Sequence, residues 1–89
     1  MNTNLYKYLG FAIRKNSVVI GVDNILNYKK KFYFILISND LSENSIKKLN
    51  DRGIVYYVIE MPHELKIKNI KAIALTDENL ADAIKNNLS

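Results

Sequence analysis

The chain has no cysteine, a single histidine and no long hydrophobic run, and each absence excludes a class of function. Without cysteine there is no disulfide framework, no thiolate nucleophile and no zinc ribbon. His63 has no second histidine or cysteine with which to share a metal ion, so we expect neither a metal site nor a bound cofactor. No apolar stretch approaches the length that crosses a bilayer, and the N-terminus lacks a signal-peptide layout. The expectation is a cytoplasmic protein without a membrane contact.

Recognisable catalytic motifs are also missing. A Ser-His-Asp arrangement would have to depend on His63 alone, and the sequence has neither a Walker loop nor a dinucleotide glycine pattern. Asp40 and Glu43 lie close together, but their positions are typical of a helix start. We therefore expect a protein that is not an enzyme.

Length and composition indicate one globular domain that spans residues 1–89. Hydrophobic residues make up 48% of the chain and charged residues 25%, as in ordinary folded domains. The net charge of +4 mildly favours a polyanionic partner. Biased codon usage explains a chain rich in lysine, asparagine and isoleucine equally well, so charge alone leaves both interpretations open.

Helix-like and strand-like segments alternate along the chain. A helical stripe predicts a first helix over residues 4–15, and Ile25 and Leu26 mark a second helix that frays into Lys29, Lys30 and Lys31. Ser42 caps a third helix that ends near Gly53. A short helix follows Pro62, and Thr76 or Asp77 caps a closing helix. Strands are expected at residues 18–20, 32–37, 54–59 and 70–75.

The expected strands at residues 32–37 and 54–59 are apolar without polar alternation, which indicates strands buried on both faces. The order of elements predicts an α/β fold, a three-layer α/β/α sandwich with a four-stranded mixed sheet and about five helices.

The stretch from Val18 to Asn27 is the most informative part of the sequence. A short apolar run ends at Gly21, and Asp23 and Asn24 then open an amphipathic segment. A glycine between strand and helix permits close approach of another backbone, and the first helical turn presents free N–H groups. Such a place suits a phosphate or polynucleotide backbone, with Asp23 and Asn24 in reach of base edges. The competing interpretation is a simple strand-to-helix turn with a favourable carboxylate and a capping amide.

Aromatic and basic residues alternate in places, which can indicate base stacking. We expect Tyr33, Tyr56 and Tyr57 in the core, whereas Tyr28 is a candidate for stacking. The lysine run from Lys29 to Lys31 fits a solvated helix end better than a binding site.

Four strings, in order, resemble the kink-turn-binding ribosomal protein family, the archaeal "L-seven-Ae" class, and above all its small bacterial YlxQ-like branch. They are Leu9-Gly10-Phe11-Ala12-Ile13-Arg14, Gly21-Val22-Asp23-Asn24, Asp40-Leu41-Ser42-Glu43-Asn44 and Thr76-Asp77-Glu78-Asn79-Leu80-Ala81. The resemblance covers nearly the whole chain and implies binding of a sharply kinked RNA bulge with tandem sheared G·A pairs.

The resemblance also implies two groups of RNA contacts. The glycine-led helix start would enter the RNA major groove, and a loop after the third strand would cover a flipped-out nucleotide. The first group is Gly21, Val22, Asp23 and Asn24, and the second is Glu64, Leu65 and Lys66. Arg14 and Lys15, which end the first helix, are expected near the Gly21 turn, where they would help to steer RNA.

Two departures from the family pattern leave the specificity open. Asn27 stands where the family usually has a lysine, so a charge-dependent contact is lost although an amide donor remains. The second segment, residues 64–69, lacks both of the family's glycines. Either close RNA approach is prevented there, or Lys66 and Lys68 replace it with phosphate contacts.

The expected partner is therefore a structured RNA, a kink-turn or ribosomal RNA, and not DNA, and the free protein is expected to be a monomer. The main alternative is the same fold without kink-turn specificity, acting as a protein- or rRNA-interaction module. A fragment of an RNA-modifying enzyme is a more distant third.

Overall fold

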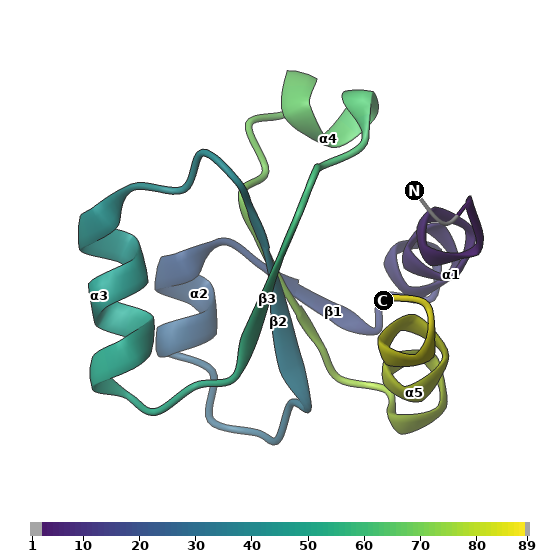
Figure 1. Ribbon diagram of the computed structural model, residues 1–89. Helices are drawn as coiled ribbons and strands as arrows, with labels where there is room; N and C mark the ends of the chain where they lie inside the picture. Colours follow the sequence, from purple (N-terminus) through teal and green to yellow (C-terminus); the bar gives the residue numbers. More distant parts are fainter. Residues whose placement is uncertain (1–2, 89) are drawn as a thin grey trace.

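The computed structural model describes residues 3–88, which form five helices and four strands (Figure 1). In chain order the elements are α1 (Thr3–Arg14), β1 (Val18–Ile20), α2 (Val22–Leu26), β2 (Phe34–Ser38), α3 (Glu43–Asp51), β3 (Tyr56–Ile59), α4 (His63–Ile67), β4 (Ala72–Leu75) and α5 (Glu78–Asn86). The mixed α/β fold predicted from the sequence is confirmed.

The four strands form one sheet in the order β1-β4-β2-β3. Strands β2 and β3 are parallel, and β4 is antiparallel to both β1 and β2. Strands β1, β2 and β3 therefore all point the same way, and their C-terminal ends lie together where β4 begins. Helix α4 lies at this end of the sheet (Figure 1), which we call the α4 end.

Helices cover both faces of the sheet. Helices α1 and α5 pack on one face with α4 at its end, around buried residues such as Leu9, Leu36 and Ile84. Helices α2 and α3 pack on the other face around Ile25 and Leu49. This is the three-layer arrangement expected from the alternation of elements, and Figure 1 shows the two helical layers on either side of the sheet.

The central strands β2 and β4 are buried along their whole lengths, and for β2 the unbroken apolar run predicted this burial. The prediction was wrong for residues 54–59. Val58 is 58% exposed, because β3 is an edge strand with a neighbour on one side only, and Val55, just before β3, is 59% exposed. A run of β-forming residues looks the same in a central strand and in an edge strand, so the sequence did not distinguish them.

Several local signals were correct. The Ser42 side chain caps α3 by accepting from the Ser45 N–H, and Asp77 caps α5 by accepting from the Leu80 N–H. Gly53 follows α3 with a left-handed φ of 65°. The second helix is shorter than expected, because α2 ends at Leu26, and the following lysines lie in the loop that leads to β2.

Within residues 3–88, no helix has both the length and the apolar character needed to cross a membrane.

Candidate functional site

Gly21 joins β1 to α2 in a backbone conformation that other residues rarely adopt. Its φ is 94° and its ψ is 140°, and its N–H donates to the Ala72 carbonyl at 2.9 Å. A Cβ atom built at this position would contact only the Asn24 Nδ2 atom, at 3.7 Å. The glycine is therefore required by the positive φ of the turn rather than by a close approach within the protein.

Asn24 holds this turn together. Its Nδ2 atom donates to the Ile20 carbonyl at 2.9 Å, across the Gly21 turn. The side chain is exposed, so its oxygen and its second N–H remain available to a partner. Asp23 is also exposed, whereas Val22 is half-buried against the α2–α3 side of the core. Asn24 therefore braces the turn from the donor side and does not cap α2, for which no side-chain cap hydrogen bond is present, and its side chain keeps capacity for a further contact.

The second predicted group lies on α4, whose two faces differ. Leu65 is only 8% exposed and packs in the core, so this residue anchors the helix rather than facing a partner. Glu64, Lys66 and Lys68 are exposed. The Leu65 carbonyl accepts from the Ile70 N–H at 2.9 Å, which ties the end of α4 to the segment that leads into β4.

The two predicted groups lie at the same end of the sheet. Gly21 donates to Ala72, the first residue of β4, and β4 directly follows the segment that leaves α4. The start of α2 and the whole of α4 therefore flank the α4 end (Figure 1). Residues 21–24 and 64–68 are far apart in the sequence, and the sheet brings them together.

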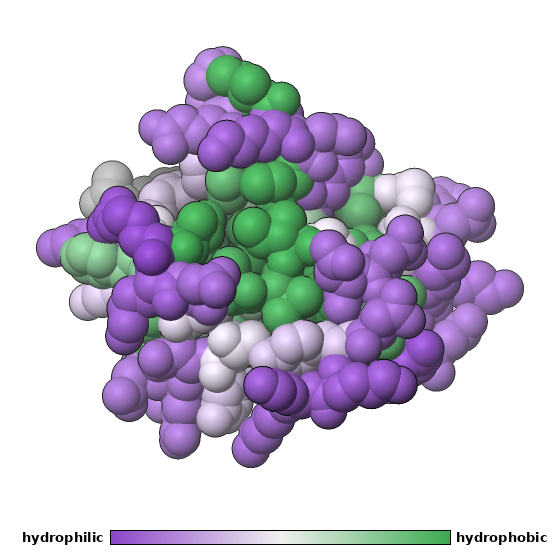
Figure 2. All heavy atoms as spheres, turned by 180° about the vertical axis from the view of Figure 1, so that it is seen from behind, coloured by the Kyte–Doolittle hydropathy of each residue, from purple (hydrophilic) through white to green (hydrophobic). Residues whose placement is uncertain are grey.

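A partly exposed apolar strip along the edge of the sheet leads up to the Gly21 turn. Strand β1 is an edge strand, and residues 18–22 are all half-buried rather than covered. On the face shown in Figure 2, apolar side chains gather in the middle, below the polar surface of α4 and between two polar flanks.

The charges at the α4 end are partly compensated. The Lys66 ammonium lies 3.4 Å from the Glu60 carboxylate, and the Lys71 ammonium lies 3.5 Å from that of Asp40. Lys68 takes part in none of the ion pairs found among residues 3–88. This end therefore offers hydrogen-bonding groups and a few cations rather than a strongly positive field.

Arg14 and Lys15 point to different ends of the molecule. The Arg14 guanidinium lies 5.0 Å from the centre of the Phe11 ring, and its side chain lines a groove between α1 and α4 with His63 and Glu64. The Lys15 ammonium instead lies 3.8 Å from the Asp77 carboxylate. The prediction that both lie near the Gly21 turn was wrong for Lys15, because β1 separates that residue from Gly21. Arg14 contributes to the α4 side of the site.

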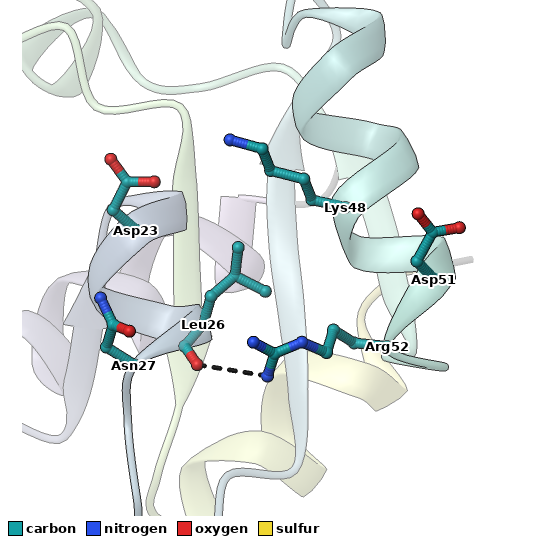
Figure 3. A pocket seen from close by; sticks show the side chains of 6 residues that line it. All are labelled: Asp23, Leu26, Asn27, Lys48, Asp51 and Arg52. Carbon is teal, nitrogen blue, oxygen red and sulfur yellow. Dashed lines mark hydrogen bonds between the residues drawn. The ribbon is translucent and has the colours of Figure 1, made fainter.

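Asn27 is at the C-terminal end of α2, where it lines a pocket of about 370 Å³ between α2 and α3 (Figure 3). The Arg52 guanidinium reaches into this pocket and donates to the Leu26 carbonyl at 3.4 Å. The other lining residues are Asp23, Lys48 and Asp51. Asn27 therefore shares this pocket with charges of both signs, and Asp23 is common to the pocket and to the first turn of α2.

The most exposed large apolar residue of the α4 end was not predicted. Ile67 is 71% exposed, on the opposite side of α4 from Leu65. Two residues along a helix correspond to a rotation of about 200°, so a core-facing Leu65 implies an outward-facing Ile67. That spacing is a signal from which the sequence could have identified Ile67.

The α4 end thus combines an exposed amide at Asn24, a cation at Lys68 and an apolar side chain at Ile67. Such a set can hydrogen-bond base edges, contact phosphates and cover a base. A scan against models of protein families found no match for the chain, and a search of curated proteins found none either.

Proposed function

We propose that the protein binds structured RNA of the kink-turn type through the α4 end of its sheet. The main support for this proposal is a single observation about the fold. The two segments that the family resemblance singles out, residues 21–24 and 64–68, lie at the same end of the sheet although they are distant in sequence.

In the proposed complex, the exposed amide of Asn24 hydrogen-bonds the edges of non-Watson–Crick base pairs. Lys68 and Arg14 contact phosphates, and Ile67 covers an unstacked base. The protein captures the bent RNA by binding that conformation more tightly than the extended one. No chemical step is involved, and the setting is a cytoplasmic ribonucleoprotein in which the free protein is a monomer.

One observation favours the alternative of an interaction module without kink-turn specificity. Residues 63–67 form a regular helix, so their backbone is enclosed by side chains rather than open to close RNA approach. The pairing of Lys66 with Glu60 further reduces the charge available for phosphates. Both features lower the affinity that the second segment can supply.

The test is a titration of the purified protein against a kink-turn RNA and a twin in which the G·A pairs are disrupted, at low and at physiological salt. Specific recognition predicts tight binding to the intact RNA alone. Weak, equal and strongly salt-dependent binding to both RNAs would support the alternative.

Asn24→Ala should remove most of the discrimination between the two RNAs, a loss of about 1–3 kcal/mol if its amide contacts a base edge. Asn86→Ala, at an exposed position of α5, is the matched control and should leave discrimination unchanged. The free energy of unfolding is measured for both variants, because Asn24 also donates to the Ile20 carbonyl. Unchanged discrimination in Asn24→Ala would remove this residue from the interface.

A further inference from the structure

The loop of residues 27–33, between α2 and β2, concentrates positive charge at the end of the sheet opposite α4 (Figure 1). Lys29, Lys30 and Lys31 are all exposed. The ion pairs found among residues 3–88 all involve other lysines, so no carboxylate within 4.0 Å compensates these three charges. The densest run of cations in the chain is therefore outside the site described above.

The loop is anchored at both ends rather than hanging free. The Tyr28 and Phe32 rings contact each other with centroids 6.4 Å apart, and Phe32 packs against the α2–α3 side of the core. The Tyr33 N–H donates to the Leu75 carbonyl at 2.9 Å. An anchored loop loses less conformational entropy on binding, which makes its lysines better contacts than those of a flexible segment.

Tyr33 adds an aromatic surface beside these charges. We expected its ring in the core, but Tyr33 precedes β2 and is 36% exposed. The Lys31 ammonium lies 5.0 Å from the centre of the Tyr33 ring. An exposed ring next to lysines is the combination with which proteins hold single-stranded nucleic acid, because every base can stack and every phosphate can pair.

The surroundings of the loop add one more cation. Arg52 is exposed and reaches the C-terminal end of α2, where its guanidinium donates to the Leu26 carbonyl at 3.4 Å. Asp77, at the same end of the sheet, is paired with Lys15. The neighbouring pocket is lined by Asp51 and Asp23 as well as by cations, so charges of both signs meet there. The uncompensated positive charge is therefore on the lysines of the loop.

We propose that the Lys29–Tyr33 loop is a second RNA-binding surface that holds a single-stranded segment, with the lysines on phosphates and a base stacked on Tyr33. Strand β2 separates this loop from the α4 end, and five residues of strand correspond to a length of about 17 Å. The protein would thereby hold a folded RNA element at one end and a flanking single strand at the other. This second surface does not depend on kink-turn recognition.

Fluorescence anisotropy with a short fluorescein-labelled oligouridine tests the proposal on the full chain. Replacing Lys29, Lys30 and Lys31 by alanine should lower the slope of log affinity against log salt by about 2, since each single-strand phosphate contact contributes about 0.7. The matched control replaces Lys7, Lys47 and Lys85, which are exposed lysines on helices and take part in none of the ion pairs among residues 3–88. Both triple variants lower the net charge of +4 by the same amount.

The aromatic contact is tested separately. Tyr33→Leu should weaken oligouridine binding about tenfold, whereas Tyr33→Phe keeps the ring and should bind within about twofold of the wild type. Equal losses in the two triple variants, or no loss in Tyr33→Leu, would overturn the proposal. Displacement of the oligouridine by polyglutamate as readily as by unlabelled oligouridine would also overturn it, because the loop would then be a surface for acidic proteins.

The two binding measurements distinguish failure of kink-turn recognition from failure of the second surface. A wild type that binds intact and disrupted kink-turn RNA equally, yet binds oligouridine through the loop, would refute kink-turn recognition and uphold the second surface. Asn24→Ala should leave oligouridine binding unchanged, because Asn24 lies at the far end of the sheet.

Discussion

Gly21 and Gly10 show how differently two glycines in one chain are constrained. Gly21 has a φ of 94°, in the region that side chains with a Cβ rarely occupy. Gly10 lies within helix α1, and a Cβ there would contact only the flexible end of Arg14, at 3.7 Å. The first glycine is required by the backbone and the second is not.

Gly21→Ala should lower the free energy of unfolding by about 1–3 kcal/mol, because alanine would have to adopt this strained conformation. Gly10→Ala should raise it by about 0.5–1 kcal/mol, as expected for a helix interior. Urea denaturation of both variants measures the two changes. Equal effects would mean that the Gly21 turn does not depend on its positive φ.

Ser38 and Asp40 form a small polar unit at the C-terminal end of β2. The Ser38 hydroxyl donates to the Asp40 carboxylate, and this hydrogen bond holds the pKa of that carboxyl below its ordinary value of 3.8. The nearby Lys71 ammonium lowers the pKa further, against an opposing effect of burial. A carboxyl whose pKa is lowered by folding stabilises the protein when ionised, and this stabilisation is lost as the pH falls through the lowered pKa.

Ser38→Ala should therefore destabilise the protein at pH values above the ordinary pKa of Asp40, and the difference from the wild type should shrink below it. The free energy of unfolding of both proteins, measured across acidic and neutral pH, shows the change. A difference that does not vary with pH would mean that Ser38 acts through packing alone, since its side chain is buried.

Residue-level predictions from the sequence succeeded where the backbone dictates the residue type. The caps at Ser42 and Asp77 and the turn at Gly21 are local, so a few neighbouring residues specify them. The placement of Lys15 is not local. Lys15 precedes β1, and the start of α5 at Asp77 lies beside it. This neighbour is distant in the sequence, so no local pattern predicts it.

At the scale of elements, α4 shows how a short helix can be both anchor and contact surface. Its apolar residues point to opposite sides, with Leu65 in the core and Ile67 in solvent. The sequence alone presents both as apolar residues in a basic segment. The division between them follows from the helical rotation once α4 is seen to pack by Leu65.

Leu65→Ala should cost about 2–4 kcal/mol of folding stability, because it removes a buried side chain that fixes α4. Ile67→Ala should change stability by no more than about 0.5 kcal/mol, since exposed positions contribute little. Thermal or urea unfolding measures both. RNA affinity should fall in Ile67→Ala, and an unchanged affinity would remove Ile67 from the proposed interface.

The positions of the strands were predicted well, but the prediction of burial was correct for one of two strands expected to be buried on both faces. Residues 34–38 form a central strand that is fully buried, as expected from its apolar run, and residues 72–75 form a second buried central strand. The similar run at residues 56–59 forms an edge strand instead. The order of strands in a sheet arises from pairing between distant segments, so no local pattern contains it.

At the scale of the whole molecule, the sheet separates two surfaces of different character. The α4 end has an exposed amide, an exposed isoleucine and lysines that are partly paired with carboxylates. The opposite end has the uncompensated lysines of the 27–33 loop. The net charge of +4 pointed to a polyanionic partner but not to where the charge is concentrated.

The most direct test of RNA binding through the α4 end is NMR mapping of amide signals on titration with a kink-turn RNA that has closed stems and no single-stranded flanks. If RNA binds at the α4 end, the signals of residues 21–24 and 63–68 should shift or broaden together, with little change on α3. If neither segment shows a change, or if the changes are confined to the 27–33 loop, RNA does not bind at the α4 end.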